Sequence, residues 1–410
     1  MRRSTGDSDS IRTRTVGVSK GNWLEVFWVF LKLGLTAFGG PVAHLGYFRS
    51  EFVERRKWLD ETSFSDLVAL CQFLPGPASS QVGMALGQQR AGWLGSLMAW
   101  IGFTMPSALA LILFAYGITQ FSDWAASGAI HGLKLVAVAV VAQAVWGMAK
   151  TLCPDRTRAA LAIFSALLTL MLPTWLGQLV TILACGLIGW WAVQLTPEES
   201  VPLIGYGVSR TAGAIALSVF FLLLLALPLI VAATGSALWA LVEGFYRSGS
   251  LVFGGGHVVL PLLQGAVVPT GAVSNAEFLA GYGAAQAIPG PLFTFAAYLG
   301  AVMHGQLSGW QGGMLFLLVI FLPAWLLVIG VLPFWDALRQ RAVIRSAMAG
   351  VNAGVVGILL SALYDPIWTS AIQVKTDFGV SLAAFGLLVY ARTSPVIVVL
   401  FGVAAGWLLM

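Results

Sequence analysis

Charged side chains are scarce in this sequence. Lys, Arg, Asp and Glu make up only 10% of the 410 residues, whereas a typical soluble domain has about 25%. Hydrophobic residues reach 58% and the mean hydropathy is +0.87, which excludes a soluble domain. The apolar residues form runs of about 18 to 25, the length of a membrane-crossing helix, and no repeated ten-residue alternation indicates a membrane barrel. We expect an all-α polytopic membrane protein.

Several functional signatures are missing as well. The sequence has no GxxxxGK[ST] loop and no polar stretch longer than a tail of about 20 residues, which excludes an ATP-driven pump. HExxH and GxSxG are absent, so a membrane-embedded enzyme is only the alternative from another class. The three cysteines form no CxxC pair and the four histidines lack metal-ligand spacing. We therefore expect no catalytic residues, no cofactor and no metal.

Positive charge is concentrated at the N-terminus. Five basic and two acidic residues in the first 20 positions supply +3 of the net charge of +5. Because Lys and Arg mark cytoplasmic flanks, residues 1–21 are predicted to be a basic cytoplasmic tail. No basic face with interleaved stacking aromatics occurs elsewhere, so we expect no nucleic-acid partner.

Sequence phrases recur once, in the same order and at nearly constant spacing. An FGG phrase recurs after 215 residues, a PGP phrase preceded by Gln after 214, and a proline within an apolar run after 217. This predicts two copies of one unit, since internal repeats are a strong indicator of architecture. We assign the copies to residues 22–195 and 236–410, joined by a linker at residues 196–235 that contains one transmembrane helix.

The Lys and Arg content of equivalent loops alternates between the copies. Residues 49–57 contain four basic residues and their counterpart 264–276 contains none, whereas residues 121–132 contain none and 334–345 contain three. Since cytoplasmic loops are enriched in Lys and Arg, equivalent loops are expected on opposite sides of the membrane. This predicts two inverted-topology repeats, the plan of many secondary transporters.

Proline and glycine interrupt four apolar segments, near Gly39, Gly76, Gly254 and Gly290. Proline cannot donate the helical hydrogen bond, and glycine is a weak helix former. Broken backbone at membrane depth is tolerated only where it is buried in protein or lines a watery cavity. We expect these four segments to be broken or re-entrant helices, among about 10 to 13 hydrophobic segments in all.

Small polar side chains follow the first PGP break, and one hydroxyl follows the second. Helix N-termini with nearby hydroxyls bind oxyanions, so we expect a substrate site where the breaks meet. A packing kink is the alternative. The expected site residues are Gly39, Gly40, Gln72, Pro75, Gly76, Pro77, Ser79, Ser80, Gln81, Gly254, Gly255, Gln286, Pro289, Gly290, Pro291 and Thr294.

Lys32 and Arg247 occupy equivalent positions, 215 residues apart, within apolar runs. A cation at the centre of a membrane helix costs about 2.5 to 3.5 kcal/mol and usually marks a substrate path. We expect both to neutralise an anion; the alternatives are snorkelling or pairing with a nearby glutamate. Arg90 is either a pore-mouth cation or an interfacial anchor. His44 and His257 follow the FGG breaks, where a proton-linked role is the alternative to none.

Several of these residues belong to longer motifs. The first copy contains FGGP at residues 38–41, HLGYFR at 44–49, EFV at 51–53, RRKWL at 55–59 and CQFLPGPASSQ at 71–81; the second contains FGGGH at 253–257 and AIPGP at 287–291. These motifs resemble the chromate ion transporter family, and the resemblance extends from about Leu24 to at least Pro333.

The resemblance implies the two-domain form of a multi-pass protein of the bacterial inner membrane. Such a protein would export chromate by secondary active transport and confer chromate resistance, with sulfate or another oxyanion as a related substrate. Chromate is a tetrahedral dianion, which agrees with paired helix N-termini and paired cations. The implied partners are chromate, sulfate and the lipid bilayer. The sequence leaves open the coupling ion, the direction of transport and a homo-oligomeric assembly.

Overall fold

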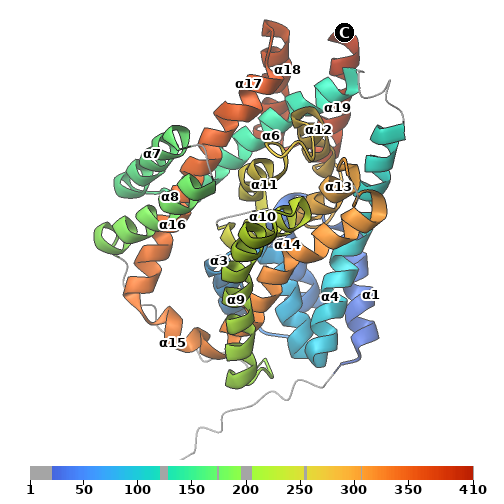
Figure 1. The fold of residues 1–410 in the computed structure, drawn as a ribbon. Helices are drawn as coiled ribbons and strands as arrows, with labels where there is room; N and C mark the ends of the chain where they lie inside the picture. Colours follow the sequence, from blue (N-terminus) through green and yellow to red (C-terminus); the bar gives the residue numbers. More distant parts are fainter. Residues whose placement is uncertain are drawn as a thin grey trace, which may run out of the picture.

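The computed structural model of the chain describes residues 21–120, 128–172, 175–194, 206–253, 256–305 and 307–409. Every regular element in these ranges is a helix (Figure 1). Among the described residues, five helices are long and apolar enough to cross a membrane: Ala78–Ile118, Gly128–Leu152, Arg210–Thr234, Gly309–Leu338 and Ala342–Ala371. The predicted all-α polytopic architecture is confirmed.

The first half begins with a helix that stops just before the FGG phrase, and the next helix starts at the last glycine of that phrase. Its helices are α1 (Trp23–Thr36), α2 (Gly40–Phe48), a π-helical turn (Arg49–Arg55), α3 (Glu61–Phe73), α4 (Ala78–Gln120), α6 (Gly128–Leu152), α7 (Arg156–Met171) and α8 (Trp175–Ala192). Side-chain oxygens of Asn22, Asp60 and Asp155 accept N–H groups in the first turns of α1, α3 and α7, which fixes where these helices begin.

A single helix, α9 (Arg210–Thr234), leads into the second half, where the elements follow in the same order and near the same spacing. They are α10 (Ala237–Leu251), α11 (Val259–Val267), α12 (Asn275–Ala285), α13 (Phe295–Val302), α14 (Gly309–Val331), α15 (Trp335–Arg339), α16 (Ala342–Ala362), α17 (Thr369–Ala371), α18 (Lys375–Val389) and α19 (Pro395–Leu409). Short 3-10 turns at Gly256–Val258 and Leu292–Thr294 precede α11 and α13. The protein is therefore a repeated polytopic membrane protein.

Helix α4 is two helices that meet in a tight turn. Ala91 and Gly92 have non-helical backbone angles, and Gly92 has φ +64. A Cβ atom on Gly87 would overlap the carbonyl oxygen of Gly95, so the two arms touch through backbone. The second half repeats this arrangement, because α13 and α14 are joined through Gly309 at φ +62 and approach closely at Gly300 and Gly312. Small residues permit such close helix packing within a membrane.

The halves exchange one helix each. Helix α16 of the second half packs against α7 and α8 of the first, whereas α6 of the first half packs against α12, α18 and α19 of the second (Figure 1). Glycines form both contacts: Gly128 and Gly132 face Gly406 and Gly402, and Gly350 faces Gly189. The two halves are consequently intertwined.

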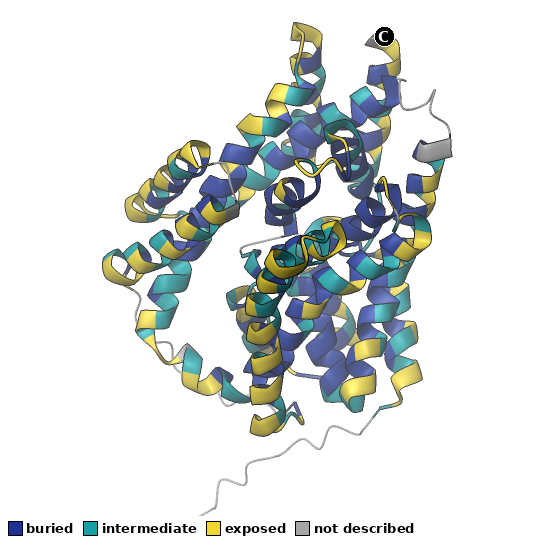
Figure 2. Cartoon of the chain, in the orientation of Figure 1, coloured by how far each residue is buried: buried dark blue, intermediate teal, exposed yellow. Residues whose placement is uncertain are grey.

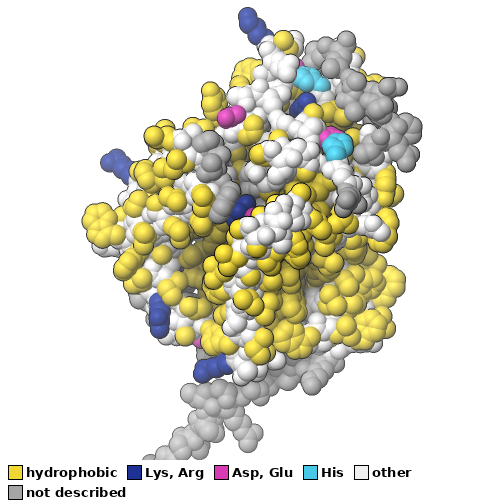
Figure 3. All heavy atoms as spheres, in the orientation of Figure 1, with side chains coloured by type: hydrophobic (Ala, Val, Ile, Leu, Met, Phe, Trp, Pro, Cys, Tyr) yellow, Lys and Arg dark blue, Asp and Glu magenta, His cyan; other side chains and the backbone are white. Residues whose placement is uncertain are grey.

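The outer surface is mostly apolar. Figure 3 shows hydrophobic side chains over much of one face, and Figure 2 shows that α9 is exposed along its length. Phe221, Leu225 and Leu229 on this helix are 54%, 68% and 70% exposed. Exposure of so many apolar side chains to water is unfavourable, whereas their exposure to lipid is favourable. Helix α9 therefore faces the bilayer.

Candidate functional site

The predicted breaks meet in reciprocal pairs. The amide of Gly290, in the second PGP loop, donates to the carbonyl of Ala37 at the end of α1 over 2.9 Å; the amide of Gly76, in the first PGP loop, donates to the carbonyl of Val252 at the end of α10 over 2.6 Å. The carbonyls at a helix end have no intrahelical donor. Here each PGP loop supplies an amide donor to such a carbonyl of the opposite half. Gly254 and Gly255 lie outside the described residues.

Both PGP loops require glycine for two reasons: the backbone has a positive φ, and a neighbouring residue leaves little room for a Cβ atom. Gly76 has φ +121 and Gly290 has φ +98, a region that favours glycine. A Cβ atom on Gly290 would overlap Ser107 Oγ, and one on Gly76 would lie 3.1 Å from Ala324 Cβ. Ser107 and Ala324 occupy equivalent places, each directly after the proline within a long helix. The backbones of the two halves therefore cross at nearly minimum distance.

The two crossings differ in their side chains. Ser107 Oγ donates to the carbonyl of Pro289. Ala324 has no hydroxyl for the equivalent carbonyl of Pro75, which instead accepts a hydrogen bond of 2.9 Å from Gln81 Nε2. The carbonyl in the first PGP loop is thus bound by the Gln81 amide of the same half. The carbonyl in the second PGP loop is bound by the Ser107 hydroxyl of the opposite half. The two crossings are therefore asymmetric, and Ser107 was not among the predicted residues.

A polar cluster surrounds the start of α4. His44 Nε2 lies 3.2 Å from the carbonyl of Ala37, and its Nδ1 lies 3.2 Å from Ser79 Oγ. Because a carbonyl can only accept, we assign the proton to Nε2, so Ser79 donates to Nδ1. His44 and Ser79 are buried, and the Phe103 ring packs against the histidine in a T-shaped arrangement. The hydroxyl of Ser79 is consequently committed to the protein.

Ser80 differs from its neighbour. Its hydroxyl is buried in the first turn of α4 and has no hydrogen-bond partner among the residues described, nor does Gln81 Oε1. Unsatisfied buried polar atoms are uncommon in folded proteins, and the amides of this turn add positive potential. Of Ser79, Ser80 and the Gln81 side-chain amide, only the Ser80 hydroxyl has no hydrogen-bond partner among the described residues.

The equivalent turn of the second half lacks a free hydroxyl in the described structure. Thr294 is buried and donates to the carbonyl of Pro291 over 2.8 Å, which differs from the expectation of a donor facing substrate. Pro77 is buried ahead of α4. Gln72 is exposed on α3, while its counterpart Gln286 lines a cavity. The two glutamines therefore do not share a role in this structure.

The two equivalent cations have different surroundings. Helix α1 buries Val29, Phe30 and Leu33, which leaves Lys32 on its exposed face. Arg247 is largely buried and forms a 2.8 Å ion pair with Glu243. The expected convergence of both cations on one anion is therefore not supported, because helix rotation turns Lys32 outward. For Arg247 the structure shows the alternative, pairing with a glutamate.

Arg90 belongs to an ion-pair cluster at the start of α1. Its guanidinium lies 3.1 Å from Glu25, which also binds Arg56 at 3.2 Å. Both arginines lie over the ring of Trp58, at 5.1 and 5.9 Å from its centroid. Such a cluster of Arg, Glu and Trp is typical of an interface. The contacts of Arg90 therefore favour the interfacial anchor over the pore-mouth cation.

A cavity of about 330 Å³ adjoins the crossing of α1 with the second PGP loop. Gly39 and Gly40 of the first FGG break form part of its wall, and Gln286 and Gly290 form another part. Tertiary structure adds polar groups that the sequence pattern could not assign: Gln143 from α6, His257 from the second FGG break, and Arg392 and Thr393 from the loop after α18. No acidic residue is among its described lining residues.

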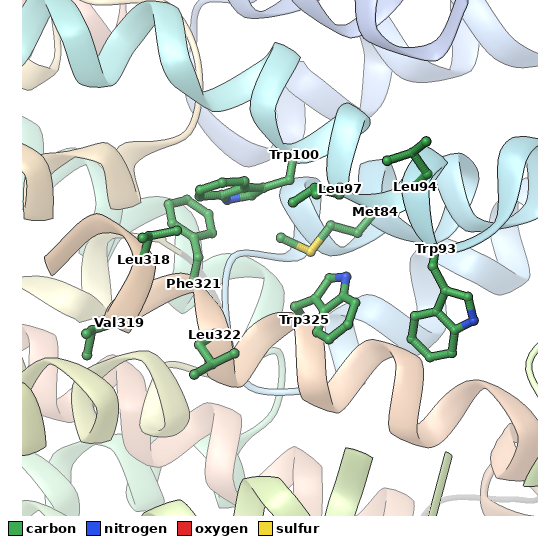
Figure 4. Close-up of a pocket in the computed structure, with 10 residues that line it drawn as sticks. All are labelled: Met84, Trp93, Leu94, Leu97, Trp100, Leu318, Val319, Phe321, Leu322 and Trp325. Atoms are coloured by element: carbon green, nitrogen blue, oxygen red, sulfur yellow. The ribbon is translucent and has the colours of Figure 1, made fainter. Parts of the chain in front are cut away.

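A larger cavity of about 620 Å³ lies between α4 and α14 (Figure 4). Its described lining is apolar, with the rings of Trp93, Trp100 and Trp325 around it, and several of the lining leucines are exposed. A dianion in such surroundings would lose its hydration without compensation. This cavity suits a hydrocarbon chain and not an oxyanion.

Comparison with known proteins gives a consistent result. A family model described as "Chromate transporter" matches the chain twice, at residues 24–190 and 239–407. The "Chromate transport protein" of Pseudomonas aeruginosa is 29% identical over 392 residues, which cover 94% of this chain and 92% of the relative. The "Probable chromate transport protein" of Synechococcus elongatus is 26% identical over 82% of both chains. The "Chromate transport protein" of Cupriavidus metallidurans is 24% identical over 92% and 90% of the two. No solved structure matches this chain.

Proposed function

This chain belongs to the chromate transporter family, and from that premise we propose that it exports chromate across the bacterial inner membrane by secondary active transport and thereby confers chromate resistance. The observation that supports this proposal most is the pair of reciprocal hydrogen bonds at Gly76 and Gly290. Each joins a helix end of one half to a broken loop of the other. A small movement between the halves changes both crossings together, as alternating access requires.

The membrane potential favours export of a dianion. Moving one charge across 100 mV changes its free energy by about 2.3 kcal/mol, so two charges gain about 4.6 kcal/mol per 100 mV. With a negative cell interior, the membrane potential therefore contributes to the driving force for secondary active export, and no nucleotide is needed. Ser80, the amides at the start of α4 and the polar cavity beside Gly40 are the groups that would replace part of the anion's hydration.

The driving force can be tested with purified protein in liposomes. A valinomycin-mediated potassium gradient sets the potential without a pH gradient. We expect labelled chromate to accumulate under an interior-positive potential and not under an interior-negative one. An absolute requirement for a pH gradient would instead support proton coupling through His44 or His257.

The same liposomes distinguish the substrates. Sulfate is also a tetrahedral dianion, so a site that reads charge and shape admits it. Sulfate, phosphate and molybdate are therefore added as competitors. Faster transport of sulfate than of chromate would favour the alternative of a sulfate-type carrier, and no flux of any oxyanion in folded protein would favour the enzyme alternative. Cells that express the protein are expected to accumulate less chromate, which tests the direction.

A further inference from the structure

Arg392 lies at the end of α18 in an unusual backbone conformation. Its φ is +50, and outside glycine the described chain has one other positive value, at Lys57. The amide of Thr393 donates to the carbonyl of Leu387 over 2.9 Å and that of Ala391 to Gly386 over 3.2 Å. These bonds hold the loop as the cap of α18, a position where glycine or asparagine is the usual residue. An arginine held there against its backbone preference indicates a use for the side chain.

The Arg392 side chain belongs to a concave polar site. Together with Thr393 it lines the cavity of about 330 Å³, a volume within the range of small-ligand pockets, about 300 to 1,000 Å³. Gln143 reaches this cavity from α6, and Gln286 from the segment before the second PGP. Arginine is the only charged residue in the described lining, which also contains Gly40 and Gly290 from the crossing of the breaks.

His257 supplies a further donor. Its Nδ1 lies 2.6 Å from the hydroxyl of Tyr282, a fully buried residue. Nδ1 is the one acceptor that the described structure offers this phenol, so we assign the phenol as donor and the histidine proton to Nε2. The ring lines the cavity, and Nε2–H then remains for an acceptor. An anion with several oxygens matches this combination of guanidinium, imidazole and amide donors.

We propose that this cavity is a binding site for a tetrahedral oxyanion, with Arg392 as its charge partner, from which the anion reaches the crossing at Gly290. The proposal deepens the proposed function, on which it rests, by assigning a substrate-binding residue outside the breaks. Chromate and sulfate share the required chemistry, and the test separates them.

The test measures equilibrium binding of labelled sulfate to the full-length protein in nanodiscs of zwitterionic lipid, and its displacement by chromate. Arg392→Asn removes the charge but keeps a residue that tolerates the left-handed backbone. Arg392→Lys keeps the charge. Lys375→Gln, at the opposite end of α18, is the matched control. We expect Arg392→Asn to weaken binding of both anions by about tenfold or more, as for a lost charged hydrogen bond, and Lys375→Gln to leave it unchanged.

The outcomes are distinguishable. Arg392→Asn is expected to melt at the wild-type temperature, and Arg392→Gly gives a second variant with an unstrained backbone. If the wild type binds both anions and Arg392→Asn or Arg392→Gly binds them equally well, the cavity is not the site and the proposed function stands. If chromate does not displace sulfate, the site does not bind chromate. If the wild type transports no oxyanion in liposomes, the proposed function fails and this assignment with it.

Discussion

At the residue scale, chemical type and helix rotation decide which polar groups reach the breaks. Ser79 and Ser80 are adjacent, yet the first donates to His44 and the second has no partner in the described structure. Lys32 and Arg247 match in sequence position, yet one is exposed and the other paired. Sequence spacing alone could not separate these cases, because the lateral contacts of a helix depend on which neighbour covers each face.

Replacing Arg247 by a neutral residue and replacing Lys32 by a neutral residue are expected to have different effects on stability. Arg247→Gln leaves the largely buried Glu243 without its cation, and breaking a buried pair costs about 3 to 5 kcal/mol. We expect this variant to lose much of its thermal stability. Lys32→Gln removes an exposed charge and is expected to keep both stability and chromate uptake, as measured by melting in detergent and by flux in liposomes. Loss of chromate flux in a stable Lys32→Gln variant would show instead that Lys32 contributes to the anion path.

At the element scale, the arrangement of broken helices follows from local chemistry. The PGP and FGG phrases predicted where helices end, and α1, α3 and α10 do end there, because proline and glycine act within one turn. The exchange of α6 and α16 could not be predicted, since it depends on glycine contacts between segments more than 150 residues apart in sequence. Arg392 joins the cavity through tertiary packing of the loop after α18, so no sequence pattern indicated it.

The close contact between Gly290 and Ser107 predicts that a methyl group added at Gly290 destabilises the protein. Gly290→Ala combines backbone strain with overlap against Ser107 Oγ, whereas Gly271→Ala, at φ +72 with open space around it, adds strain alone. Left-handed backbone costs about 1 to 2 kcal/mol and overpacking about 1 to 3 kcal/mol more. We expect Gly290→Ala to lower the melting temperature clearly further than Gly271→Ala. Equal decreases would show that the second PGP loop does not touch the first half closely.

At the scale of the whole molecule, two basic loops lie at the same end as the start of α1. Arg56 pairs with Glu25 in the first turn of α1, and Figure 1 shows the start of α1 and α15 at one end and α12 at the other. The basic loops at residues 49–57 and 339–345 therefore lie at the same end of the molecule as the start of α1. This agrees with inverted repeats in which the loop before α12 faces away from the cytoplasm.

Cysteine labelling tests this orientation. Arg55 and Thr270 are exposed at equivalent loops of the two halves, and each is changed to Cys in a Cys153→Ser background, which leaves the buried Cys71 and Cys185. In intact cells an impermeant maleimide should label position 270 and not position 55. Equal labelling of both positions in intact cells would rule out inverted repeats.

In the proposed function, chromate crosses the membrane where the two sets of breaks meet, beside the start of α4. The most direct measurement is the initial rate of chromate uptake into liposomes by Ser80→Ala, with Ser361→Ala as control, since Ser361 is a buried serine whose hydroxyl donates to Ile358 in α16. A lost hydrogen bond to a charged ligand is worth about 1.5 to 3 kcal/mol, so KM for chromate should rise by about tenfold or more in Ser80→Ala and remain unchanged in Ser361→Ala. Wild-type KM and rate in stable Ser80→Ala protein would show that chromate does not pass the start of α4.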